Sequence, residues 1–231
     1  MNPYIGITDF TSFAQVQQML NVFKTFLLSD SRRMLHVGVV WQNVSPRKEN
    51  IANIFSSQET YNCLHYADCA NQPCLGESIV EAVHWCGKYI HAIQLDMTWP
   101  DPAEIIDGIN ASRKKVEVIL QIGKGSLAQA SNDPREVVKR LEDYRNIVNR
   151  VLLDESVGRG LCMDVSRLTQ FVLEIRKNFP TLGIGVCGGL GPDTVHIIAP
   201  LARLVPEISI DADVDWNMAE EYLTSALRLL F

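Results

Sequence analysis

The chain has 231 residues, of which 47% are hydrophobic and 21% are charged, and its formal net charge is −6 at pH 7. This composition is that of an ordinary globular protein and argues against a disordered or low-complexity chain. An acidic balance without a long run of Lys and Arg disfavours nucleic acid as a partner. No apolar run reaches the roughly 18 residues that a membrane-spanning helix needs, so we expect no membrane partner.

The first ten residues lack the basic stretch and following apolar stretch of a secretory signal peptide. We therefore expect a cytoplasmic protein whose cysteines are reduced. The six cysteines are Cys63, Cys69, Cys74, Cys86, Cys162 and Cys187.

Short β-branched or apolar runs alternate along the chain with stretches of helical periodicity. The predicted strands are residues 4–8, 34–40, 61–67, 90–96, 116–123, 150–154, 182–187 and 207–211. Between them, 101–115 and 132–149 each begin near an Asp-Pro pair, a typical helix start. The stretch 43–60 is the least regular and predicts a long loop with a short helix.

Eight strands alternating with helices predict a parallel sheet with right-handed crossovers. The absence of a Gly/Ser/Pro-rich linker favours one α/β domain over residues 1–231, a single (β/α)8 TIM barrel. An open, doubly wound sheet is the alternative, although the first strand is not followed by G-x-G-x-x-G. In a barrel, the functional residues are expected where the strands end.

The seventh predicted strand ends in a glycine pair, within the stretch GIGVCGGLGPDT. Barrel loops at this position often bind phosphate through backbone N–H groups, and glycine permits close approach. We interpret Gly188 and Gly189 as part of a ligand-binding loop; a plain tight turn is the alternative.

Other strand ends carry candidate polar groups. Asp154 follows Val-Leu-Leu and predicts a general acid or base, or else a capping residue. Arg159, between two glycines, and Arg47, after a proline, are candidate anion ligands or else solvated surface residues. Trp41 ends the second strand and is a candidate for stacking on a ligand ring, or else lid packing.

The strand-end segments YIGIT, GVVWQNVSPR, IQLD, VLLDESVGRG and GVCGGLGPDTV together resemble phosphoribosylanthranilate isomerase, a barrel of the ribulose-phosphate-binding group. The resemblance implies a sugar-phosphate isomerase that performs an aldose-to-ketose Amadori rearrangement without a metal or an organic cofactor. It implies that Asp154 is the general acid, that Arg47 holds a substrate carboxylate, and that Gly188 and Gly189 hold the phosphate.

Three strand ends depart from the family pattern, and at the fourth strand Asp96 stands where the family has a His. Ile5 stands where the family has its catalytic Cys, so Asp9 and Asp96 become the candidate bases. Asp211 and Asp213 stand where the family has its second phosphate segment. Like charges a few ångströms apart cost on the order of 1 to 4 kcal/mol, which disfavours an ordinary phosphate ester there.

Two alternatives to a cofactor-free isomerase remain open. One is a binding protein without catalysis, or a barrel of different specificity. The other is a metal-dependent, epimerase-like enzyme in which His36, His65 and Cys187 hold the ion. The expected partner is a small-molecule ligand, and a homodimer is left open.

The cysteine-rich stretch 63–74 also carries a histidine, His65, but its spacing C-x5-C-x4-C is not that of a structural zinc site. We interpret Cys63, Cys69 and Cys74 as ordinary thiols, with zinc as the alternative.

Overall fold

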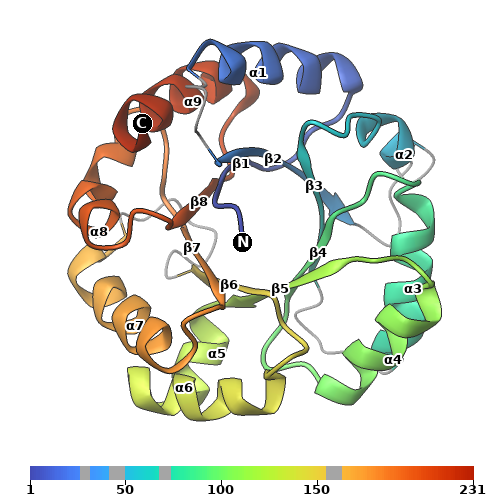
Figure 1. Cartoon of the computed structure of the whole chain (residues 1–231), viewed down its shortest axis with the longest axis vertical. Coiled ribbons are helices and arrows are strands. Elements are labelled where there is room, and N and C mark those ends of the chain that lie inside the picture. Colours follow the sequence, from blue (N-terminus) through green and yellow to red (C-terminus); the bar gives the residue numbers. More distant parts are fainter. Residues whose placement is uncertain (27–31, 42–49, 68–73, 155–162) are drawn as a thin grey trace.

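The structure is a computed structural model that describes residues 1–26, 32–41, 50–67, 74–154 and 163–231. Eight parallel strands form a closed barrel in chain order, and helices surround it (Figure 1). The strands are β1 (Tyr4–Ile7), β2 (Met34–Trp41), β3 (Tyr61–Ala67), β4 (Ala92–Asp96), β5 (Glu117–Ile122), β6 (Arg150–Asp154), β7 (Gly183–Cys187) and β8 (Ser209–Ala212). Each predicted strand is present, with its ends shifted by at most two residues, and the closed barrel excludes the open-sheet alternative.

The barrel closes where β1 pairs with β8, with Ile5 opposite Ile210 and Gly6 opposite Asp211. The helices are α1 (Phe13–Phe26), α2 (Ile51–Ile54), α3 (Leu75–Trp85), α4 (Pro102–Ser112), α5 (Lys124–Gln129), α6 (Pro134–Leu141), α7 (Val165–Asn178), α8 (Ala199–Leu204) and α9 (Trp216–Leu230), with 3-10 turns η2 (Glu142–Tyr144) and η3 (Val195–Ile198). None of the helices in the described part of the chain is long and apolar enough to span a bilayer.

Local sequence explains where several helices begin. The carboxylates of Asp101 and Asp133 accept hydrogen bonds from the backbone N–H two residues later, and a proline follows each. The predicted helix over 132–149 ends earlier than expected: α6 stops at Leu141 and continues only as η2. The chain then turns through Asn146, whose φ of 67° lies in the left-handed region.

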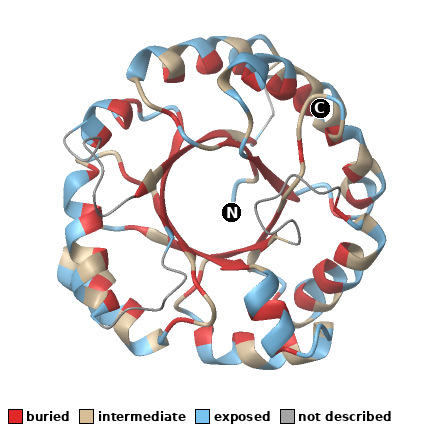
Figure 2. Ribbon diagram, turned by 180° about the vertical axis from the view of Figure 1, so that it is seen from behind, coloured by how far each residue is buried: buried red, intermediate tan, exposed pale blue. Residues whose placement is uncertain are grey.

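The main hydrophobic core lies between the outer face of the barrel and the inner faces of the helices (Figure 2). Alternate strand residues point to opposite faces, so a second, smaller cluster fills the barrel interior; it includes Tyr4, Tyr61, Cys63, Ile119 and Leu152. Branched apolar residues usually dominate this interior. Here it also holds buried polar side chains, among them His36, His65, Gln94, Gln121, Arg150 and Asp211.

Candidate functional site

A cavity of about 450 Å³ opens where the strands end. Among the described residues, every strand except β2 contributes to its wall, directly or through the loop that follows it. The lining residues are Thr8, His65, Gln94, Asp96, Gln121, Asp154, Cys187, Gly188, Gly189, Leu190, Gly191, Thr194, Asp211, Asp213, Val214, Asp215 and Met218. Its volume is that of a small-molecule site.

Two predicted carboxylates, Asp96 on β4 and Asp154 on β6, line this cavity. Gln121, from the strand between them, donates a hydrogen bond from Nε2 to Oδ2 of Asp154 (3.1 Å). Its Oε1 accepts one from Nε2 of Gln94 (2.7 Å). The two amides therefore orient the Asp154 carboxylate.

The environment of Asp96 differs from that of Asp154. Partial burial, and then the nearby charge of Asp154, raise the pKa of the Asp96 carboxyl. Two carboxyl groups in one cavity, one held by a donor and the other pushed toward its protonated form, can divide the roles of base and acid.

A third carboxylate, Asp211 on β8, is buried and lies beside two imidazoles. Burial alone would raise its pKa, but His36, His65 and a hydrogen bond from the Thr8 hydroxyl lower the pKa of Asp211 overall. Burial lowers the pKa of His65 to about 4, the dominant effect over the opposing charge of Asp211. His65 is therefore neutral at pH 7.

The loop after β7 contributes backbone to the cavity, as expected for Gly188 and Gly189. Their φ angles of 103° and 65° lie in the region that favours glycine. Two hydrogen bonds of the Thr194 hydroxyl fix the conformation of this loop. The hydroxyl accepts a hydrogen bond from the N–H of Gly191 (2.8 Å) and donates one to the carbonyl of Gly189 (2.7 Å). The loop is thus preorganised for close approach by a ligand, whatever the ligand's charge.

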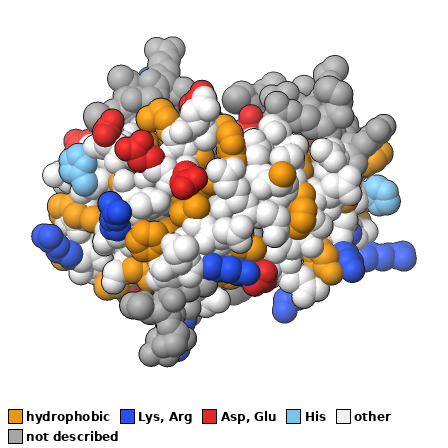
Figure 3. Space-filling view, turned by 90° about the horizontal axis from the view of Figure 1, so that it is seen from above, with side chains coloured by type: hydrophobic (Ala, Val, Ile, Leu, Met, Phe, Trp, Pro, Cys, Tyr) orange, Lys and Arg blue, Asp and Glu red, His pale blue; other side chains and the backbone are white. Residues whose placement is uncertain are grey.

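The charge of the cavity is negative over the described residues. Its lining includes five carboxylates, Asp96, Asp154, Asp211, Asp213 and Asp215, and no Lys or Arg from the described ranges. In the side view of Figure 3, acidic side chains gather toward the upper edge, while most Lys and Arg lie lower. Partial desolvation, and then the charges of Asp9 and Asp211, raise the pKa of Asp213.

Several residues singled out from the sequence lie elsewhere. Asp9 is exposed, with a φ of 70°, and is not part of the cavity lining. Trp41 is 3% exposed and packs in the core between barrel and helices, as does Ile5, so neither side chain lines the cavity. Arg47 and Arg159, the two predicted anion ligands, lie outside the described residues.

Cys187 lines the cavity but is poorly suited to act as a nucleophile. Burial, followed by the charges of Asp154, Asp211 and Asp96, raises the pKa of its thiol well above its usual range. The thiolate, which is the reactive form, is therefore disfavoured at neutral pH.

The sequence-based reasoning missed Gln94, Gln121 and Thr8 as wall residues. A signal was available, because Gln94 lies two residues before Asp96 and side chains two apart share one face of a strand. Gln121 is likewise the last inward-facing residue of β5.

The structure changes the composition of the alternative metal site. His36, Cys63 and His65 form the cluster whose ligand atoms all lie within 4.8 Å of one another; Cys187, named with the histidines from the sequence, is not part of this group. Cys63 points into the barrel, whereas Cys74 is exposed ahead of α3, and Cys69 lies outside the described residues.

No family model and no curated protein matches the sequence. Similarity appears among solved structures. Orotidine 5′-monophosphate decarboxylase from Methanocaldococcus jannaschii, in complex with the inhibitor BMP, aligns with a TM-score of 0.57 and 12% identity over 100% of this chain and 99% of its own. The structure of the same enzyme described without that inhibitor aligns with a TM-score of 0.53 and 12% identity, covering 98% of each chain.

Phosphonopyruvate hydrolase aligns with a TM-score of 0.53 and 12% identity, over 91% of this chain and 75% of its own. Identities this low carry the fold but no activity, and the resemblance to phosphoribosylanthranilate isomerase stays a prediction. Together with the closed parallel sheet, the comparisons identify the chain as an α/β TIM barrel of the kind on which these enzymes are built.

Proposed function

We propose that the protein is an isomerase that moves protons on an uncharged polyhydroxy carbonyl compound, such as an aldose or ketose, held in the mouth cavity. The observation that carries the proposal is the pair Asp96 and Asp154 in one cavity, with different environments. This keeps the aldose–ketose chemistry implied by the sequence resemblance but exchanges the roles: Asp154, the acid by resemblance, becomes the base, and Asp96, a candidate base, becomes the acid.

The negative lining supports an uncharged substrate. A phosphate ester placed among Asp211, Asp213 and Asp215 would meet like charges, each costing on the order of 1 to 4 kcal/mol at about 4 Å. Hydroxyl groups can instead donate hydrogen bonds to carboxylates. The preorganised loop of Gly188 and Gly189 then serves to bring backbone polar groups close to the sugar.

The proposed proton movements use two carboxyl groups. Asp154, as the carboxylate, removes the proton from the carbon beside the substrate carbonyl, while Asp96, as the acid, protonates the carbonyl oxygen. The resulting enediol collapses when Asp96 takes back a hydroxyl proton and Asp154 returns its proton to the neighbouring carbon. Both residues end in their starting states, so no oxidant, reductant or organic cofactor is consumed.

An open cavity also favours catalysis over a scaffold role. A scaffold would be expected to have its mouth filled by large apolar side chains such as Trp41, Met97 and Trp99. Trp41 and Met97 pack in the core, and the Trp99 indole N–H donates to the carbonyl of Ser126 (2.9 Å). None of the three lines the cavity.

Solvent-proton exchange tests the proposal. Purified protein is incubated in D2O with a panel of uncharged aldoses and ketoses and with their phosphate esters, and deuterium at the carbon beside the carbonyl is followed by NMR. We expect enzyme-dependent exchange for an uncharged sugar. Asp154→Asn and Asp96→Asn should each slow it by about 10²- to 10⁴-fold, whereas Asp143→Asn on the exposed η2 turn should not.

Absence of exchange with every sugar would refute the isomerase proposal. Exchange only with phosphate esters would overturn the proposed substrate class, and unchanged rates in Asp154→Asn would overturn the assigned base.

A further inference from the structure

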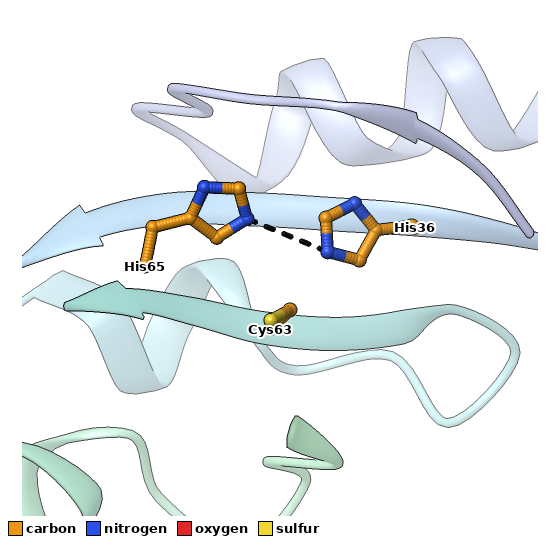
Figure 4. A group of neighbouring side chains, drawn as sticks. All are labelled: His36, Cys63 and His65. Carbon is orange, nitrogen blue, oxygen red and sulfur yellow. Dashed lines mark hydrogen bonds between the residues drawn. The ribbon is translucent and has the colours of Figure 1, made fainter. Parts of the chain in front are cut away.

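Three potential metal ligands meet inside the barrel, below the mouth cavity. His36 lies on β2, and Cys63 and His65 lie two residues apart on β3, so both β3 side chains face the interior. Figure 4 shows the two imidazoles facing each other, with Cys63 beside the gap between them. All three residues are buried.

The spacing of these atoms suits a tetrahedral cation. The two Nε2 atoms are 3.5 Å apart. An ion about 2.05 Å from each nitrogen, as in protein zinc sites, would subtend an angle of about 117° between them, close to tetrahedral. One ring nitrogen of each histidine and the Cys63 sulfur all lie within 4.8 Å of one another. A rotation of the Cys63 side chain would have to bring its sulfur to the roughly 2.3 Å from the ion that a zinc–sulfur bond needs.

The second ring nitrogen of His36 lies near a carboxylate, which is the partner that a metal-bound histidine usually has. Its Nδ1 is buried without a hydrogen bond of normal geometry, and Oδ1 of Asp211 lies 3.5 Å away. Ligating histidines typically donate their second N–H to a carboxylate, which fixes the ring and its tautomer. A cation on Nε2 would fix the proton on Nδ1 and draw that contact into a hydrogen bond.

Two glycines make room for the arrangement. A Cβ at Gly6 would lie 2.2 Å from Oδ1 of Asp211 and 2.6 Å from Nδ1 of His36. A Cβ at Gly38 would lie 2.8 Å from Nε2 of His65. The strands on this side of the barrel therefore accommodate the rings and the carboxylate at positions where an ordinary residue would displace them.

From this geometry we infer that His36, Cys63 and His65 bind one transition-metal dication of the zinc class, with Asp211 as the positioning partner of His36 and the fourth coordination position toward the mouth cavity. Two imidazoles and a thiolate are soft and borderline ligands that select zinc, cobalt or copper over magnesium or calcium. His65 and Asp211 line the cavity, which sets the direction of the open position. The Cys63 thiol loses its proton to solvent when the metal–sulfur bond forms.

Metal titration of the full-length chain tests the inference. Metal-free protein is prepared with a chelator and titrated with Zn²⁺, and separately with Co²⁺, which reports a thiolate ligand by a sulfur-to-metal charge-transfer band. We expect one ion per chain. His36→Gln and His65→Gln should each weaken binding at least tenfold, Asp211→Asn should weaken it about 10- to 100-fold, and Cys63→Ala should abolish the charge-transfer band.

Matched variants separate ligand loss from general damage. Cys86→Ala removes another buried thiol and His91→Gln another partly buried imidazole, neither of which belongs to the cluster; both should bind metal as the parent chain does. Failure of the parent chain to bind stoichiometric Zn²⁺ or Co²⁺ would overturn the inference without reference to any variant. Binding that is unchanged in His36→Gln, His65→Gln and Cys63→Ala would overturn it equally.

The inferred metal site does not depend on the proposed isomerase function. Asp96→Asn combined with Asp154→Asn should still bind one ion, because neither carboxylate belongs to the cluster. Metal binding without sugar exchange would refute only the isomerase proposal, and sugar exchange without metal binding would refute only the metal site.

Discussion

The side chain of His65 lies between the buried interior of the barrel and the mouth cavity, and it is buried in a largely desolvated position. Burial holds its pKa at about 4, below the ordinary value of 6.5. Between these two values the unfolded chain binds more protons at this residue than the folded protein does. The contribution of His65 to stability is therefore complete above pH 6.5 and is lost as the pH falls from 6.5 through 4.

We predict that the metal-free protein loses up to about 3 kcal/mol of unfolding free energy between pH 6.5 and pH 4 because of His65. Urea unfolding in the presence of a chelator, measured across this range, checks the prediction. His65→Gln should flatten the dependence, whereas replacement of the exposed His196 by Gln should leave it in place. An equally steep loss in His65→Gln would show that another group is responsible.

At the scale of elements, the glycines in β1 and β2 are explained by the side chains that these strands face and not by strand propensity. Glycine weakens a strand, because it is flexible and offers no side chain for packing. Gly6 and Gly38 nevertheless stand at central positions of these strands, where a Cβ would overlap Asp211 and His65, respectively. At Gly6 and Gly38, the low strand propensity of glycine is outweighed by the space that the buried polar side chains need.

Gly6→Ala should destabilise the protein by about 1 to 3 kcal/mol, because the buried Asp211 carboxylate has to move and overpacked cores cost this much. Gly123→Ala is the matched control. Its Cβ would meet nothing within 4 Å, and its φ of −86° suits any residue, so the change should be within about 0.5 kcal/mol. Thermal or urea unfolding measures both, and equal effects would contradict the steric explanation.

At the scale of the whole molecule, the two ends of the barrel interior have different chemistry. The mouth carries carboxylates around an open cavity. The opposite end is closed by Arg150, whose guanidinium contacts the Tyr61 hydroxyl (3.2 Å), Glu117 (3.3 Å) and the backbone carbonyl of Asn2 (2.7 Å). In a barrel, this division places function at one end and stability at the other.

Arg150→Leu is expected to lower the unfolding free energy by about 3 kcal/mol, because it removes a buried charge that joins β6 to β3, β5 and the amino-terminal residues. Arg145→Leu, which breaks an exposed pair with Glu142, should cost less than about 1 kcal/mol. Urea unfolding compares the two variants. Ligand and metal binding at the other end should persist in Arg150→Leu under conditions in which it is folded.

Much of the architecture was predictable because hydrophobic periodicity is a local property. The alternation of strands and helices, the Asp-Pro helix starts and the strand-end positions of Asp96, Asp154, Gly188, Gly189 and Asp211 follow from residues near one another in sequence. Asp9, expected at the mouth, has a φ of 70° and is not among the lining residues, although its charge raises the pKa of the lining residue Asp213. Backbone turns of this kind leave no periodic signal.

The sequence by itself determined that parallel strands and helices alternate and that polar groups stand at the strand ends, since both depend on short-range pattern. The tertiary structure alone decided which of those groups share a cavity and that Cys63, rather than Cys187, meets His36 and His65. It also decided that Ile5 and Trp41 face the helices. The physical reason is that strand register and barrel closure set which inward-facing side chains meet, and neither is encoded in any single stretch of the chain.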